Sequence, residues 1–470
     1  MNTGTARERG AILLLATLLL VAVIGFVLAL SWASVNPDGA RRRATESALA
    51  EAREALIAYA AARAINPAVG PGYLPCPDLD NDGWAEATCG SLSGELGQDE
   101  RLGRLPWKTL GIADLRDGDG ERLWYAVSTK YKGLLNCAAS AACIDMSPEA
   151  ALGTITVRDS TGTIVHDGTI AEPYRAAEGG AVAVVIAPGA PLMRMDAAGE
   201  TGRMQSRACG TGDCDQRGRC LTDPPQRAAT CDPANYLDKA PAARFGFEDN
   251  AHFADRGADG FIQGPVTIAD GRIAVNDRVS AIGYRDVMPR LMRRVALEVA
   301  ACIRDRAAAS GHYPSPVPLC AQPARSASTW AGVQDAQFGR IADEAWEESC
   351  NLASDAAHSW WKAWRENVFY ARLPGSLDIV GLDGRLIARG RDAAVIVAGP
   401  ALVRDGFVQQ RDDASMGDAR QWLEGSNALL ESARGCALAP AFACEAAGTC
   451  TRITQDTPRG DFNDAVLAIP

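Results

Sequence analysis

Residues 181–192 read AVAVVIAPGAPL, and residues 393–402 read AAVIVAGPAL. Each is a short, continuous apolar run that ends at proline and glycine, which is typical of a buried strand. A hairpin pattern, with apolar residues alternating around a glycine, precedes each run: TITVRDSTGTIV over residues 154–165 and SLDIVGLDGRLIA over residues 376–388. Strands and hairpins therefore occur twice, in the same order.

Further matches extend this repeat. Each half begins with a helix-forming segment, followed by a Pro-rich turn and a tryptophan-rich segment. The matching pairs closer to each end are NYLDK from Asn235 with QWLEG from Gln421, and VNDRVSAI from Val275 with FNDAVLAI from Phe462. We expect an α+β fold with two tandem modules, over residues 44–282 and 283–470, each a helix laid on a small antiparallel sheet with disulfide-stapled loops.

The tryptophans favour a core role over a ligand groove, because they recur at matching places in both halves. They are Trp107, Trp124, Trp360, Trp361 and Trp364. Because side chains alternate in a regular strand, we expect one of the two adjacent tryptophans to be exposed if they lie in a strand.

Composition and charge exclude some partners. The chain has 47 Lys+Arg against 58 Asp+Glu, a formal net charge of −11, so its surface repels phosphate backbones and nucleic acid is not an expected partner. The 14 cysteines include no C-x-x-C pair, which argues against zinc and thioredoxin-like sites. Their number favours disulfides formed in an oxidising compartment.

Several cysteines fall into short-range pairs, although the sequence does not fix their connectivity. The pairs are Cys76/Cys89, Cys137/Cys143, Cys209/Cys214, Cys220/Cys231, Cys302/Cys320 and Cys444/Cys450.

The N-terminal region is apolar without interruption. Residues 11–33 carry no charge and are long enough, as a helix, to cross a bilayer. Helix-forming sequence resumes over residues 41–64, where Leu49, Ala52, Leu56 and Tyr59 recur at helical spacing. We expect a leader over residues 1–10, then one long helix whose residues 11–34 form its transmembrane half. This organisation predicts an inner-membrane protein with a periplasmic or extracellular C-terminal region.

The segment Arg9-Gly10-Ala11, with the helix after it, resembles the processing site of type IV pilins and type II secretion pseudopilins. The resemblance implies cleavage after Gly10 by a prepilin peptidase, methylation of Ala11, and assembly with other pilin or pseudopilin subunits. Members of that family usually carry Glu at the fifth position after the cut, where this chain has Leu15. In that respect the chain is similar to the tip-located pseudopilin.

We therefore expect a minor pilin or pseudopilin-like structural subunit, with the large head at a filament tip or in its assembly. The alternative is a binding protein outside any filament, either anchored by the apolar segment or secreted after cleavage near Ala33. An extracytoplasmic hydrolase is a third class, but the sequence has no H-E-x-x-H, nucleophile elbow or phosphate-binding loop. We expect no enzyme activity.

The segment CPDLDNDGWAE is the sharpest candidate site. Asp78, Asp80 and Asp82 alternate and Gly83 follows, as in the first half of a calcium loop. Glu86 would complete a shortened loop, so the expected ligands are these three aspartates and Glu86, and the expected ion is Ca²⁺.

The alternative for this segment is a solvated acidic turn. The twelfth position of the loop, where a calcium loop carries a bidentate acid, is Cys89. A disulfide between Cys76 and Cys89 would clamp such a turn without any ion. The second half has no carboxylates at the matching stretch, SPVPLC from Ser315, so the site is not part of the repeated core.

Overall fold

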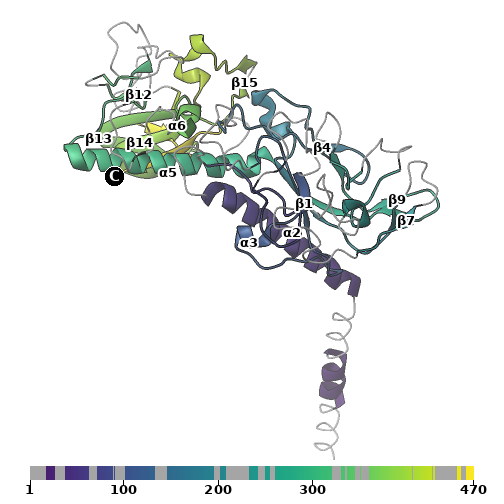
Figure 1. Ribbon diagram of the computed structural model, residues 1–470. Coiled ribbons are helices and arrows are strands. Elements are labelled where there is room, and N and C mark those ends of the chain that lie inside the picture. Colours follow the sequence, from purple (N-terminus) through teal and green to yellow (C-terminus); the bar gives the residue numbers. More distant parts are fainter. Residues whose placement is uncertain are drawn as a thin grey trace, which may run out of the picture.

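The structure is a computed structural model in which short strands outnumber helices (Figure 1). The residues that it describes are 17–26, 37–62, 71–87, 89, 101–132, 146–194, 202–207, 232–241, 249–253, 260–319, 330–333, 336–343, 350, 359–404, 406–425, 427–428, 452–456 and 462–470.

The first half of the chain centres on a four-stranded antiparallel sheet. Its strands, in spatial order, are β1 (Leu102–Arg104), β2 (Trp124–Val127), β5 (Ala183–Ala187) and β11 (Arg278–Ile282). A three-stranded sheet adds β4 (Ile164–His166), β3 (Thr156–Arg158) and β8 (Gly260–Ile262). Two ribbons are β6 (Met193–Arg194) with β7 (Arg203–Met204), and β9 (Val266–Thr267) with β10 (Ile273–Val275). The short helices are α3 (Trp107–Leu110), η3 (Pro173–Glu178) and η5 (Pro233–Asn235).

The second half is arranged in the same way. Its sheet runs β12 (Phe338–Arg340), β13 (Val368–Val380), β14 (Leu386–Val397) and β18 (Ala465–Ile469), with β17 (Arg452–Thr454) paired to β13. The ribbon is β15 (Val403–Arg404) with β16 (Phe407–Val408). The short helices are α6 (Ser359–Trp364), η8 (Asp413–Ser415) and η9 (Ala419–Gln421).

The two central sheets match in register as well as in order. Trp124 lies opposite Arg104 in the first sheet, and Phe369 lies opposite Arg340 in the second. Each arginine places its guanidinium carbon over the facing ring, at 4.2 Å from the Trp124 centroid and 4.4 Å from the Phe369 centroid. Cation–π contacts of this kind are strongest when desolvated, and both arginines are buried.

The expected hairpins are present, and their turns depend on glycine. Gly162 has φ of +90° between β3 and β4, and Gly384 has φ of +78° between β13 and β14. Residues other than glycine rarely adopt such a conformation. In the second half the hairpin is continuous with the central sheet, whereas in the first half β3 and β4 belong to a separate small sheet.

Two long helices cover the sheets and lie against each other: α2 (Pro37–Ala62) and α5 (Tyr284–Ser310) (Figure 1). The apolar face predicted for α2 is confirmed at Leu49, Ala52 and Leu56, because all three side chains are buried. Side chains of both helices and both central sheets form one continuous hydrophobic core. The boundary predicted between residues 282 and 283 falls between β11 and α5.

The predicted fold class needs correction. The single long N-terminal helix is wrong, because the described helical residues form a short helix over residues 17–26 and a separate helix, α2, that begins at Pro37. The described part is strand-rich, and two of its sheets are mixed, since β3 pairs with β8 and β13 with β17 in parallel. Apolar composition predicted the N-terminal helix, but it does not by itself predict how far a helix extends.

The predicted inner-membrane location is overturned for the same reason. Across the residues that the structure describes, none of the helices is both long enough and apolar enough to cross a bilayer.

The adjacent tryptophans Trp360 and Trp361 are both buried, with their rings 6.0 Å apart. They lie on α6 rather than on a strand, so the expected alternation does not apply. Trp124 and Trp364 are buried as well, and Trp107 is half-buried, in line with a core role.

Two disulfides are present among the described cysteines. Cys76 is bonded to Cys89, as the spacing predicts. Cys302 is bonded to Cys350 rather than to Cys320, so that predicted pair is wrong. The bond joins α5 to the segment before α6, which lie together in space although 48 residues separate the two cysteines. The other predicted cysteine pairs lie outside the described residues.

Candidate functional site

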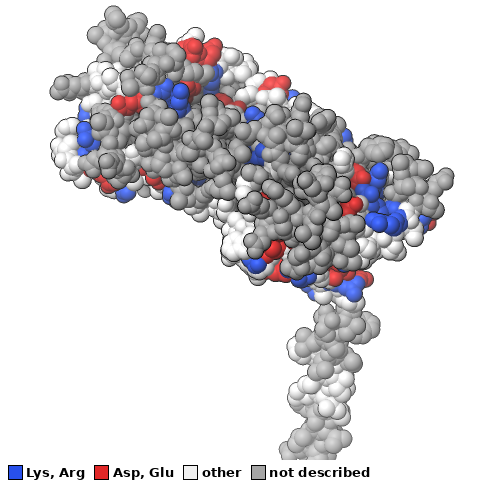
Figure 2. Space-filling view, in the orientation of Figure 1, with Lys and Arg blue, Asp and Glu red and all other residues white. Residues whose placement is uncertain are grey.

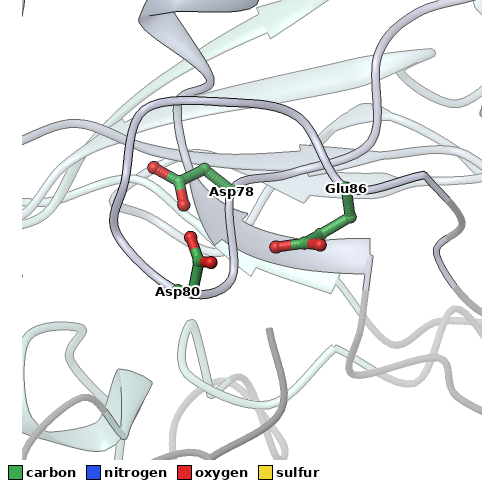
Figure 3. Close-up of side chains that lie close together, drawn as sticks. All are labelled: Asp78, Asp80 and Glu86. Atoms are coloured by element: carbon green, nitrogen blue, oxygen red, sulfur yellow. The ribbon is translucent and has the colours of Figure 1, made fainter. Parts of the chain in front are cut away.

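The acidic segment forms a tight loop between the disulfide cysteine Cys76 and α3. Figure 3 shows the carboxylates of Asp78, Asp80 and Glu86 turned toward a common space inside this loop. One carboxylate oxygen from each lies within 4.8 Å of the others. Asp78 and Asp80 are buried, at 1% and 5% exposure, and Glu86 is half-buried.

Backbone hydrogen bonds fold the loop around Asp78. Its Oδ2 accepts the Gly83 N–H at 2.7 Å, and its Oδ1 accepts the Asp82 N–H at 3.2 Å. Oε1 of Glu86 accepts the N–H of Leu79 at 3.2 Å, which closes the loop from the other side. The three acids are thus held by backbone donors rather than by flexible side chains, and their positions are preorganised.

Two positive-φ residues make the turn possible. Asn81 has φ of +63° and Gly83 has φ of +91°. Asparagine is among the few side chains that tolerate this region, and glycine does so without strain. Steric crowding also requires glycine at position 83, because a Cβ on Gly83 would lie 2.6 Å from Nε1 of Trp107.

Asp82 does not join the cluster, contrary to the predicted ligand set. Its Oδ1 accepts the N–H of Trp84 at 2.7 Å, and its carboxylate is not among the clustered ones. Trp84, next in the chain, is exposed. Asp82 still acts on the cluster through its charge, which raises the pKa of Asp78 and of Asp80.

The cluster is electrostatically costly without a cation. Burial, then the charges of Asp80 and Asp82, raises the pKa of Asp78 to about 7, although the Gly83 N–H opposes the shift. Burial also raises the pKa of Glu86 to about 7, with the nearby aspartates adding to it. The pKa of Asp80 is raised by burial and by the charge of Asp82. Near neutral pH the group therefore needs either protons or a bound cation to compensate its charge.

Two basic residues donate to oxygens of the loop other than the clustered carboxylates, and no pattern in the sequence pointed to them. Nη1 of Arg122 donates to Oδ1 of Asn81 at 2.6 Å and to its carbonyl oxygen at 3.0 Å. Nζ of Lys108 donates to the carbonyl oxygen of Asp82. Both cations bind the loop's outer oxygens and leave the inward carboxylates of the cluster for another ligand. Arg122 lies 41 residues from Asn81, so no local pattern could reveal the contact.

The second half supplies a natural comparison. Asp78 pairs through its backbone with Arg104 of β1, and Val317 pairs in the same way with Arg340 of β12. Valine therefore occupies the position equivalent to Asp78. The repeated fold does not require a carboxylate there, so the acids of the first half are additions to it.

The donor set fits a hard divalent cation. Carboxylate oxygens are the ligands that Ca²⁺ prefers, and it takes six to eight oxygens, so backbone carbonyls and water would complete the shell. The chemistry of the residues present thus fits calcium, with Asp78, Asp80 and Glu86 as protein ligands.

The other predicted site, Gly10 with Ala11, lies outside the described residues. The apolar helix that follows it is described over residues 17–26, and all of these residues are exposed. It extends away from the folded head (Figure 1).

Comparison with known proteins gives no further guide to this site. No protein-family model matches the chain. No curated protein and no solved structure shows significant similarity to it.

Proposed function

We propose that this chain is a non-enzymatic structural subunit of an extracytoplasmic filament, of the minor pilin or pseudopilin kind. The observation that carries the proposal is the apolar helix over residues 17–26. Val21 and Phe26 are 68% and 66% exposed, and the other large side chains on it are exposed as well. Such an apolar surface is unstable in water and requires a partner.

The partner that we propose is an apolar helix of another subunit. The head has its own continuous core built from α2, α5 and both central sheets, so it does not need the N-terminal helix to complete its packing. Acidic and basic side chains are interspersed on the described part of the face in Figure 2, whereas the helix carries no charge. A charged, self-contained head with an apolar helix extending from it suits a subunit that assembles through that helix.

The processing site completes this proposal. Cleavage after Gly10 by a prepilin peptidase would place Ala11 at the new N-terminus, and Leu15 stands where most pilins carry Glu. A subunit without that Glu suits the tip, where no subunit lies ahead of it. The size of the head supports the same position, since a bulky head on every subunit would obstruct helical packing.

We also propose that the head binds Ca²⁺ through Asp78, Asp80 and Glu86. Bound calcium would compensate the three buried carboxylates and brace the loop between Cys76 and α3. Its role in the proposed subunit is structural, because the cluster lies in a hydrogen-bonded turn built on backbone donors.

The test of the filament proposal is the intact mass and N-terminal sequence of the protein isolated from its native host. A chain that starts at N-methylated Ala11 supports the proposal. A start near Ser34, or an uncut Met1, contradicts it and favours a binding protein outside any filament.

A further inference from the structure

Each half of the chain contains a pair of buried carboxyl groups that the proposed function does not use. The pairs are Asp238 with Asp277 in the first half and Glu424 with Asp464 in the second, and all four residues are at most 1% exposed. In each pair the first acid follows a short 3-10 helix, η5 or η9, and the second stands just before an outer strand of the central sheet, β11 or β18.

The first pair is tied together through the backbone. Oδ2 of Asp277 accepts the N–H of Asp238 at 2.8 Å, and Oδ2 of Asp238 accepts the N–H of Asp277 at 3.3 Å. The Asn250 amide donates to Oδ2 of Asp277 at 2.8 Å, and the Gln205 amide donates to Oδ1 of Asp238 at 3.0 Å. Four segments that are distant in sequence meet at these two carboxyl groups.

The second half repeats the arrangement. Oδ2 of Asp464 accepts the N–H of Glu424 at 3.0 Å and the Asn427 amide at 2.9 Å. The Gln409 amide donates to Oε1 of Glu424 at 2.9 Å, and the N–H of Asn463 donates to its Oε2 at 3.1 Å. The N–H of Asn276 likewise donates to Oδ2 of Asp238 at 2.7 Å, so the two halves share these bonds, with Glu424 in place of Asp238.

One oxygen in each pair has no donor. Oδ1 of Asp277 and Oδ1 of Asp464 are buried without a hydrogen-bond partner among the described residues. An anionic oxygen in that position loses its hydration and gains nothing in return, whereas a protonated oxygen carries no charge. In the first acid of each pair both oxygens accept a hydrogen bond, whereas only one oxygen of the second acid does, so the first acid is the better anion.

The surrounding charges do not fully neutralise the pairs, although the charge of Arg207 opposes the rise in the pKa of Asp238 and of Asp277. Among the described residues, neither pair forms an ion pair with Arg or Lys. Arg207, next to the first pair, directs its Nη2 to Oε1 of Gln205, and Arg194 and Lys239 pair with Asp249 instead. Near the second pair, Arg411 pairs with Glu149 and Arg420 with Asp418. The two adjacent carboxyls of each pair therefore repel each other if both are ionised.

We propose that each pair is folded around one proton, carried on Oδ1 of Asp277 and on Oδ1 of Asp464, so that the head takes up two protons when it folds. The pKa directions agree with this assignment, because burial and the adjacent carboxylate raise the pKa of both Asp277 and Asp464 well above their usual range. The head is consequently stabilised by acid, and it loosens at the starts of β11 and β18 when these protons leave.

The test is the pH dependence of urea unfolding of the full chain, with disulfides intact, from pH 5 upward. Over the pH range in which the folded pairs hold their protons and the unfolded chain does not, each bound proton makes the unfolding equilibrium constant rise ten-fold per pH unit. The neutral amide in Asp277→Asn and Asp464→Asn has the shape of a protonated carboxyl group. Each substitution should therefore lower by one the slope of the logarithm of the unfolding equilibrium constant against pH. The double variant should lower this slope by two.

The matched control is Asp383→Asn, which changes an exposed carboxylate in a hairpin turn. It should leave the slope unchanged. An unchanged slope in the Asp277 and Asp464 variants, with stability lost equally at every pH, would overturn the proposal.

A second measurement covers the case in which these variants do not fold. The Asp78→Asn, Asp80→Asn, Glu86→Gln background removes the raised carboxyls of the acidic loop, and infrared spectra at neutral pH should then show a residual carboxylic-acid carbonyl band from the two pairs. Its absence in the folded protein would also overturn the proposal.

Discussion

Arg411 and Glu149 form an ion pair that joins the two halves of the chain, with Nη1 of Arg411 donating to Oε1 of Glu149. The side chain of Arg411 is 4% exposed, and Asn367 donates to the other oxygen of Glu149 at 2.8 Å. A segment of the first half is thus held by two residues of the second. The contact adds to the shared core in fixing how the halves sit together.

Arg411→Ala should destabilise the protein by about 3 kcal/mol, because it leaves Glu149 without the partner that compensates its charge. Urea unfolding measures the change. The control is Arg420→Ala, which removes an exposed ion pair with Asp418 and should cost less than about 1 kcal/mol. Equal effects of the two substitutions would show that the contact between the halves contributes no more than a surface pair.

Calcium should raise the melting temperature of the protein, because it binds the folded cluster and not the unfolded chain. At a free concentration one hundred times its Kd, the stabilisation is about 2.7 kcal/mol. Asp78→Asn, Asp80→Asn and Glu86→Gln should each reduce the shift, whereas Asp82→Asn should largely retain it, since Asp82 lies outside the cluster. Thermal melting with calcium and with chelator makes the comparison, and a shift lost equally in Asp82→Asn would contradict the three-residue ligand set.

The calcium effect should increase with pH. The pKa values of Asp78 and Glu86 are raised to about 7, so without the ion their contribution to stability is fully present below about pH 4 and is lost as the pH rises through 7. Calcium binds the ionised carboxylates, so protons compete with it. For each proton that calcium displaces, its affinity falls roughly ten-fold per pH unit below the pKa. The calcium-induced shift should be small at pH 5 and large at pH 8. A shift independent of pH would exclude these carboxyls as ligands.

The disulfide between Cys302 and Cys350 should stabilise the protein more than the disulfide between Cys76 and Cys89 does. It closes a separation of 48 residues, for which chain entropy predicts roughly 4 kcal/mol. Removing both cysteines should lower stability by that order, more than removal of Cys76 and Cys89, which are 13 residues apart. Non-reducing peptide mapping checks the pairing itself, and a Cys302–Cys320 peptide would contradict the structure.

Local patterns in the sequence predicted the turns and buried strands well. Gly162 and Gly384 identified the hairpins because a turn with a positive φ favours glycine, whatever residues lie around it. The Asn-Asp repeat at Asn276 and Asn463 was visible in the sequence as a match between the two halves. Its structural role was not visible, because the buried carboxyl groups bind residues that are distant in sequence, such as Gln205, 33 residues from Asp238.

Contacts between distant segments account for what the sequence did not predict. Cys302 pairs with Cys350, although Cys320 is nearer in sequence, because the fold brings the segment before α6 next to α5. The acidic loop was found from its spacing, but the spacing did not show that Asp82 binds the N–H of Trp84 and stays out of the cluster. The single long N-terminal helix was predicted from an apolar run followed by helix-forming sequence, and neither pattern shows where one helix ends and the next begins.

The central claim, assembly through the apolar helix, is tested most directly by photo-crosslinking in the native host. A benzophenone amino acid replaces Phe26 on the helix, and a second chain carries it at Leu297, an exposed apolar position on α5. The proposal predicts that the Phe26 probe forms adducts with the N-terminal apolar segments of other subunits, while the Leu297 probe does not. The absence of any protein adduct from Phe26, or the same adducts from both positions, would contradict it.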